Sequence, residues 1–148
     1  MIREFTIGQA AQSSGVKVTT IRYYESIGLM PEPRRVESGR RIYDQSAVGL
    51  LGFIRHARDL GFAVEAIREL IGLQENPGTD CRQADELARL HLATTRSRIN
   101  QLRILESELE RMIKSCSGGE VGTCEIVTSL FDHSKCLSDH NQKYPTEL

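Results

Sequence analysis

Tryptophan is absent from the sequence, and aromatic residues make up only 5% of its 148 residues. With a hydrophobic fraction of 39%, this shortage argues against one large core and favours a small core joined to a helix that self-associates. No apolar run approaches the roughly 20 residues of a membrane-spanning helix. The first residues, MIREFTIGQ, also lack the apolar segment of an export signal. We therefore expect a cytoplasmic protein with no membrane contact.

Catalytic motifs are lacking as well. No nucleophile stands in a pattern with a recognisable base, and neither a phosphate-binding glycine loop nor a paired-carboxylate motif occurs. The sequence therefore does not predict an enzyme. Disulfides are not expected either, because cysteines in the cytoplasm remain reduced and available as metal ligands or redox groups. The four cysteines are Cys81, Cys116, Cys124 and Cys136.

An overall excess of basic charge is missing too. The formal net charge is −1, yet residues 34–58 contain six arginines against two acidic residues, Glu37 and Asp44. A local basic patch in a near-neutral protein is typical of a nucleic-acid contact confined to one face.

Two short helices are predicted before this basic region. Thr6 and Gln9 form the pattern of a capping box, which predicts a helix that ends at Gly15. A second helix is predicted between Val18 and Gly28. Two short helices joined by a tight turn are the outline of a helix-turn-helix.

The segment after the second helix has the features of a wing. Residues 29–33 contain two prolines, which argue against a continued helix. RRVESGRRIY, residues 34–43, predicts two short strands joined by a Glu-Ser-Gly turn. Asp44 can then cap a helix that ends near Gly61, and another helical segment follows. Apolar residues expected to face inward recur there at helical spacing: Val48, Leu51, Ile54, Ala57, Ile67, Leu70 and Ile71.

A single long helix is predicted further along the chain, because residues 80–114 contain neither proline nor glycine. Its apolar residues recur mostly at spacings of three and four, so one face is apolar and needs a partner. The alternative is that this helix lies against its own N-terminal module, which is too small to cover its length. The apolar face comprises Ala84, Ala88, Leu92, Ile99, Leu102, Leu105, Leu109 and Met112.

DNA contacts are expected from two places. The N-terminal half of the second helix of a helix-turn-helix enters the major groove, where Arg22 suits bidentate contacts to guanine. Arg40 and Arg41, at the turn of the wing, suit backbone phosphates. The alternative position for the tyrosines is the core, which we favour for Tyr24. The predicted DNA-binding residues are Thr19, Thr20, Arg22, Tyr23, Arg40, Arg41 and Tyr43.

TIRYYESIGL at residues 20–29, GRRIY at 39–43 and LGF at 60–62 together resemble the signature of the MerR family of bacterial transcription regulators. The likeness extends through the long helix into the cysteines. It implies a homodimer held by an antiparallel coiled coil of the two long helices. It also implies that the dimer binds double-stranded promoter DNA whose spacer is too long, and that the effector-bound dimer kinks and untwists this DNA for RNA polymerase.

The cysteines flank the long helix. At about 1.5 Å per residue, Cys81 and Cys116 lie roughly 50 Å apart in one chain and cannot share a ligand there. In an antiparallel pair, the partner subunit's Cys81 comes next to Cys116 and Cys124. This predicts a site of three thiolates across the interface, and thiolates suit soft or borderline metal ions. Burial as small apolar residues is the alternative, and it fits poorly with their polar and glycine-rich neighbours.

The resemblance also narrows the choice of effector metal. Members that respond to divalent ions have a cysteine at the start of the dimerisation helix, where copper-sensing members have serine, and this sequence has Cys81 there. The implied effector is a zinc, cadmium, lead or mercury ion. Three departures disfavour zinc relative to cadmium or lead. The seven-residue loop before Cys124 also has the copper-sensing length, Ser117 replaces a second cysteine of zinc sensors, and Val121 replaces their loop histidine.

Other assignments stay open. His133, Cys136 and His140 have ligand-like spacing and could complete the metal shell, form a second site or belong to a polar tail. A Cu(I)-responsive regulator is one alternative, and a thiol redox sensor with a Cys116–Cys124 disulfide is another. An iron-sulfur sensor is disfavoured because the cysteines do not cluster, and a drug-binding regulator because few residues follow the long helix.

We therefore expect a mainly α-helical protein in three parts. Residues 1–76 form a winged helix-turn-helix DNA-binding domain, and residues 77–115 form the dimerisation helix. Residues 116–148 form the metal-binding loop and the C-terminal tail.

Overall fold

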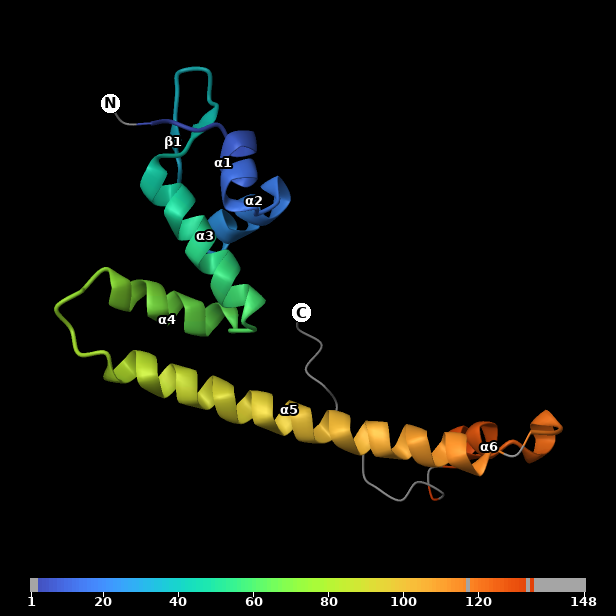
Figure 1. The fold of residues 1–148 in the computed structure, drawn as a ribbon. Helices are drawn as coiled ribbons and strands as arrows, with labels where there is room; N and C mark the ends of the chain where they lie inside the picture. Colours follow the sequence, from blue (N-terminus) through green and yellow to red (C-terminus); the bar gives the residue numbers. More distant parts are fainter. Residues whose placement is uncertain (1–2, 117, 133, 135–148) are drawn as a thin grey trace. The chain divides into compact units, whose positions relative to one another are not determined.

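The computed structural model describes residues 3–116, 118–132 and 134. It is mainly α-helical, as predicted (Figure 1). Two short strands, β1 (Arg34–Arg35) and β2 (Arg41–Ile42), pair antiparallel and form the predicted wing. The helices are α1 (Ile7–Ser14), α2 (Val18–Ser26), α3 (Gln45–Asp59), α4 (Val64–Gln74), α5 (Arg82–Ser115) and α6 (Glu125–Phe131), with one 3-10 turn, η1 (Val121–Thr123).

The chain divides after Asp85 into two compact units. The division lies inside α5 because the first turn of this helix belongs to the N-terminal unit, where the Gln83 side-chain amide donates to the Glu69 carboxylate at 3.1 Å. The residue boundaries of the DNA-binding domain, the dimerisation helix and the C-terminal part therefore remain predictions.

Local capping sets the ends of α1. The Thr6 hydroxyl accepts from the Gln9 backbone N–H at 3.3 Å, and the Gln9 side chain accepts from the Thr6 N–H at 2.9 Å, which confirms the capping box. Gly15 ends the helix with φ of 72°, a conformation that costs residues with a side chain more than glycine. An added Cβ would also lie 1.6 Å from Nη1 of Arg55. Because Nη1 ends a flexible side chain that can move aside, the positive φ is the main reason that glycine is favoured at this turn.

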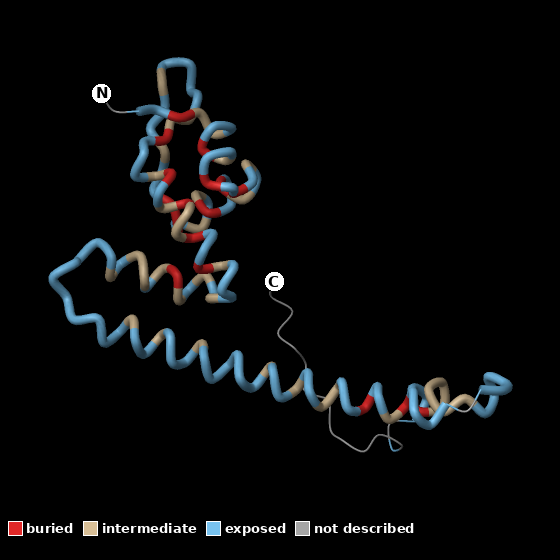
Figure 2. The backbone as a smooth tube through the Cα atoms, viewed as in Figure 1, coloured by how far each residue is buried: buried red, intermediate tan, exposed pale blue. Residues whose placement is uncertain are grey.

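The core of the N-terminal unit lies between the helices of the helix-turn-helix and α3 and α4 (Figure 2). Its four fully buried large side chains are Ile21, Leu51, Ile54 and Ile67. Asp44 caps α3 by accepting from the Ala47 N–H at 2.8 Å, as predicted. The predicted inward positions of this helix, Val48, Leu51, Ile54 and Ala57, are all buried, because their spacing places them on one face.

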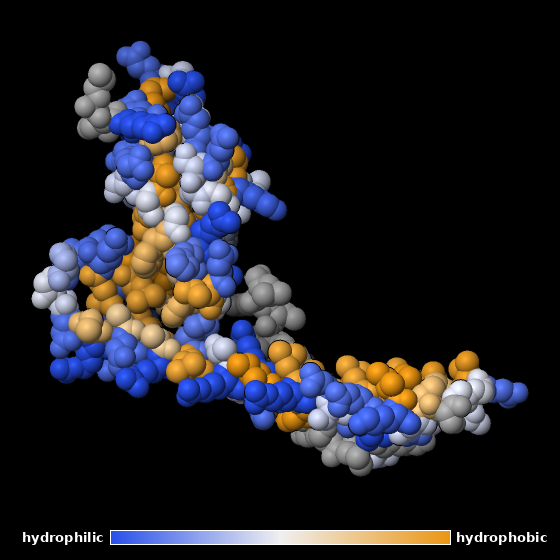
Figure 3. All heavy atoms as spheres, in the orientation of Figure 1, coloured by the Kyte–Doolittle hydropathy of each residue, from blue (hydrophilic) through white to orange (hydrophobic). Residues whose placement is uncertain are grey.

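The C-terminal unit contains most of α5, a helix of 34 residues, which is about 50 Å long. Near its end Glu108 and Met112 are buried, and so is Ser129 of α6. Much of the remaining apolar face is open to solvent along the helix (Figure 3). The large exposed apolar side chains of α5 are Leu90, Leu92, Ile99, Leu102, Leu109 and Ile113, of which all but Leu90 lie on this face. None of the described helices is both long and apolar enough to cross a membrane.

Candidate DNA-binding surface and thiol site

The two faces of α2 differ sharply. Ile21 and Tyr24 point into the core, Tyr24 being 7% exposed, which confirms the expectation for this tyrosine. Arg22 is exposed, and Tyr23 is 54% exposed. Thr19 is also exposed, and Thr20 is half-buried. Most of the residues predicted to contact DNA on α2 therefore share an accessible face.

The turn of the wing presents Arg40. Gly39, with φ of 78°, makes the turn possible, and its carbonyl accepts from Nη1 of Arg35 at 3.0 Å. Arg40 follows and is exposed. It has the accessible position at the tip of the wing that a phosphate contact needs.

Arg41 and Tyr43 lie differently from the prediction. Arg41 is on β2, not at the turn, and its Nε is 3.1 Å from Oε2 of Glu25. Tyr43 is 2% exposed, and its hydroxyl donates to the other carboxylate oxygen of Glu25. Burial, and next the hydrogen bond to Glu25, raise the pKa of Tyr43 well above its ordinary value. Both side chains bind Glu25 and so hold the wing on α2. We therefore do not include them among the residues that we propose to contact DNA.

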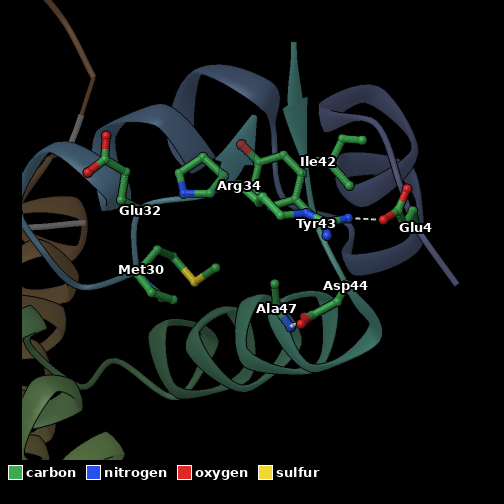
Figure 4. A pocket seen from close by; sticks show the side chains of 10 residues that line it. Glu4, Met30, Glu32, Arg34, Ile42, Tyr43, Asp44 and Ala47 are labelled. Atoms are coloured by element: carbon green, nitrogen blue, oxygen red, sulfur yellow. Dashed lines mark hydrogen bonds and ion pairs between the residues drawn. The ribbon is translucent and has the colours of Figure 1, made fainter. Parts of the chain in front are cut away.

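The base of the wing has further local contacts (Figure 4). Arg34 forms an ion pair with Glu4, which precedes α1. Met30, Ile42 and Tyr43 line the adjoining cleft. The chain before α1 is also joined to the wing by backbone hydrogen bonds between Phe5 and Tyr43 of 2.8 and 2.9 Å.

Two thiols meet at the end of α5. Cys116 follows the last residue of that helix, and Cys124 is the N-cap of α6. The nearby backbone N–H groups of Val127 and Ile126, and then the Cys116 thiol, lower the pKa of Cys124. A lowered pKa increases the thiolate fraction, which is the form that binds metal or attacks a disulfide.

The third predicted ligand lies at the other end of the helix. Cys81 is exposed and immediately precedes α5. No group of three or more His, Cys, Asp or Glu residues suited to a metal ion occurs within residues 3–116, 118–132 and 134. The structure therefore brings Cys116 near Cys124, whereas Cys81 belongs to the N-terminal unit. His133, Cys136 and His140 lie outside the described residues.

The comparisons with known proteins identify the family. Residues 5–73 match the family model for MerR HTH family regulatory protein, and residues 48–112 match the model for MerR, DNA binding. The chain is also 37% identical over 124 residues to a probable heavy metal-dependent transcriptional regulator of Haemophilus influenzae, covering 84% of this chain and 97% of that one. This chain belongs to the MerR family. The resemblance found in its sequence is thereby confirmed.

Two further similar proteins are informative. The mercuric resistance operon regulatory protein of Bacillus cereus is 34% identical and is matched over 86% of this chain and 97% of its own. The crystal structure of the transcription regulator PbrR691 from Ralstonia metallidurans CH34, in complex with lead(II), aligns with a TM-score of 0.76 at 36% identity, covering 85% of this chain and 98% of that one. As a member of this family, the protein is a DNA-binding transcription regulator and not an enzyme.

Sequence reasoning missed Glu25 in this MerR-family regulator. Its side chain is 9% exposed and binds both Arg41 and Tyr43. The available signal was the position of an acidic residue directly after the buried Tyr24. That signal is weak because the partners lie 16 and 18 residues further along the chain.

Proposed function

We propose that this MerR-family protein is a homodimeric, metal-responsive regulator that distorts promoter DNA when it binds a divalent zinc, cadmium, lead or mercury ion. The observation that carries the proposal is the placement of Cys116 at the end of α5 and of Cys124 at the N-cap of α6, near enough for the Cys116 thiol to lower the pKa of Cys124. Support comes from the relatives that are named for heavy-metal dependence and mercuric resistance, and from the one solved with lead(II).

The dimer follows from the exposed apolar face of α5. An apolar face along much of a helix of 34 residues is unfavourable in water unless a partner covers it. An antiparallel pair would cover this face and bring the partner subunit's Cys81 to Cys116 and Cys124. Three thiolates suit a divalent ion better than two, because they compensate more of its charge. When bound, the ion would link thiolates from both subunits.

The DNA is read by α2 and the wing in this proposal. Thr19, Thr20, Arg22 and Tyr23 face the major groove, and Arg40 contacts the phosphates. The proposed partner is RNA polymerase at the same promoter, which uses the DNA after the dimer has changed its shape. These events take place in the cytoplasm.

The roles of Arg22 and Arg40 can be separated by the sequence dependence and the salt dependence of operator binding. Replacing Arg22 by Ala is expected to weaken operator binding by about 1–3 kcal/mol and to relax preference at one base pair, because base contacts carry specificity. Replacing Arg40 by Ala should weaken binding evenly across sequences and reduce the salt slope by about 1. Fluorescence anisotropy with operator and mutated operators, at several salt concentrations, measures both. Equal effects on all sequences for Arg22→Ala would refute its assignment to the bases.

Metal sensing is tested by Cys124→Ser. This change is expected to abolish metal-dependent transcription and to leave operator affinity unchanged, because Cys124 and the DNA-reading residues lie in separate compact units. Run-off transcription with Zn²⁺, Cd²⁺, Pb²⁺, Hg²⁺ or Cu(I), alone and in competition, gives the response, and gel shifts give the affinity. Thr123→Ser, in the same loop, is the control and should respond normally. Loss of operator binding in Cys124→Ser would contradict this division of roles.

A thiol redox sensor is the second candidate, favoured by the same proximity of Cys116 to Cys124. It would respond to oxidant in the presence of a metal chelator, with loss of both free thiols. A Cu(I) sensor is separated from a divalent-metal sensor by Cys81→Ser. That variant should keep a Cu(I) response, since two thiolates suffice for linear Cu(I), but should lose a divalent-metal response.

A further inference from the structure

A charged cluster lies buried at the C-terminal end of α5. The side chain of Glu108 is 5% exposed and that of Arg111 is 20% exposed. Nε and Nη2 of Arg111 both donate to Oε1 of Glu108, at 3.0 and 2.7 Å. A carboxylate removed from water is costly unless a cation and hydrogen bonds compensate it. Arg111 supplies that compensation from one turn further along the same helix.

The same guanidinium also reaches α6. Its Nη1 lies 3.6 Å from Oε1 of Glu125, the first residue of that helix. The hydroxyl of Ser129, which is 3% exposed, donates to this carboxylate oxygen at 3.4 Å. Arg111 therefore joins two carboxylates from two different helices, and the second carboxylate is itself held within α6.

The position of Glu125 matters because Cys124 precedes it directly. Cys124 is the N-cap of α6, and its carbonyl accepts from the Thr128 N–H at 2.9 Å, so Cys124 moves with that turn. Cys116 instead belongs to the end of α5. The loop between them contains Gly118 and Gly119, both with positive φ, and glycine constrains a chain weakly. The loop alone is therefore a poor means of keeping the two thiols together.

We propose that Arg111 is a positioning residue of the thiol site. By holding the first turn of α6 on α5 through Glu125, it keeps Cys124 beside Cys116 and so sets the affinity of the pair for its ligand. This inference deepens the proposed function and rests on it for the identity of the ligand. The contact between the two thiols is independent of that identity, and it can be measured without any metal.

The experiment measures how readily the two thiols react with each other. In the full chain carrying Cys81→Ser and Cys136→Ser, only Cys116 and Cys124 remain. With a chelator present, the protein is equilibrated with reduced and oxidised glutathione. One oxidised glutathione accepts two electrons from the thiol pair and yields two reduced glutathione molecules and the protein disulfide. The equilibrium constant reports the effective concentration of one thiol at the other.

Glu125→Asp is the principal variant. It keeps the negative charge next to Cys124, which itself raises the pKa of that thiol, but it shortens the side chain and breaks the contact with Arg111. We expect the equilibrium constant to fall about threefold to fivefold, as for the loss of a partly exposed ion pair. Glu120→Asp, at an exposed residue of the loop between the two thiols, is the matched control and should leave the equilibrium constant unchanged.

Arg111→Gln should lower the equilibrium constant of disulfide formation at least as far as Glu125→Asp does. Combining the two substitutions in one chain should cause little further loss. Should Arg111→Gln fail to fold because Glu108 loses this ion pair, Glu125→Asp alone decides. Unchanged constants in Glu125→Asp, with unchanged thermal unfolding, would overturn the proposal and leave Arg111 a merely structural partner of Glu108.

The ligand is tested separately with Cd²⁺ alone, through the ultraviolet thiolate-to-metal absorbance of chains that retain all cysteines. Glu125→Asp is expected to weaken Cd²⁺ binding by the same factor as it lowers the disulfide constant, with unchanged operator affinity. If the unaltered protein does not bind Cd²⁺ or any other tested ion, the metal function fails. A falling disulfide constant would then still support the positioning role.

Discussion

Mixing the Cys81→Ser variant with the Cys124→Ser variant is expected to restore a metal response that neither variant shows alone. Each homodimer lacks a ligand at both sites. In a mixed antiparallel dimer, one site combines Cys81 of one subunit with the intact Cys116 and Cys124 of the other, while both defects fall in the second site. The physical reason is the length of α5, 34 residues, or about 50 Å. Because of that length, one chain cannot bring its own Cys81 to its Cys116 and Cys124.

The mixing experiment has an internal control. Cys116→Ser and Cys124→Ser remove ligands from the same end of the helix, so every site in their mixed dimer still lacks one thiolate. This pair should not be restored. Subunits are exchanged by mild denaturation and refolding, and run-off transcription with the metal measures the response. Restoration in the control pair, or a full response from Cys81→Ser alone, would show that the thiolates do not come from opposite helix ends.

Replacing Glu25 by Ala is expected to lower the free energy of unfolding by about 2–3 kcal/mol. The change leaves the half-buried Arg41 without its carboxylate and the buried hydroxyl of Tyr43 without its acceptor. Operator affinity should fall as well, because the same carboxylate joins the wing to α2 and so holds Arg40 in place relative to Arg22. Urea unfolding and fluorescence anisotropy measure the two effects.

Two variants separate these contributions. Glu32→Ala, an exposed acidic residue close to the wing, should leave both quantities nearly unchanged. Glu25→Gln keeps a hydrogen-bond acceptor but loses the charge, and is expected to fall between the unaltered protein and Glu25→Ala. A Glu25→Ala protein of normal stability would show that the ion pair contributes nothing to the fold.

The contrast between Glu25 and Thr6 explains which features could be predicted. The Thr6 capping box joins residues three apart, so its pattern is visible in a short window of sequence. The same holds for the cap at Asp44, the turn at Gly39 and the apolar spacing of α3. The bonds of Glu25 reach 16 and 18 residues along the chain, and no periodicity connects those positions. For this reason the sequence does not indicate that Arg41 and Tyr43 are partners of Glu25.

The thiol site likewise has some features that the sequence predicts and others that it does not. The residue types, and the impossibility of joining Cys81 to Cys116 in one chain, follow from the sequence, because helix length depends only on the number of residues. The contact of Cys116 with Cys124, and the link from Arg111 to Glu125, were decided by the packing of α6 on α5. Sequence alone therefore determined the helices, the wing and the family, since these depend on local hydrogen bonds and spacing. Tertiary structure decided which charged side chains support the fold and which remain accessible, since that depends on where distant segments meet.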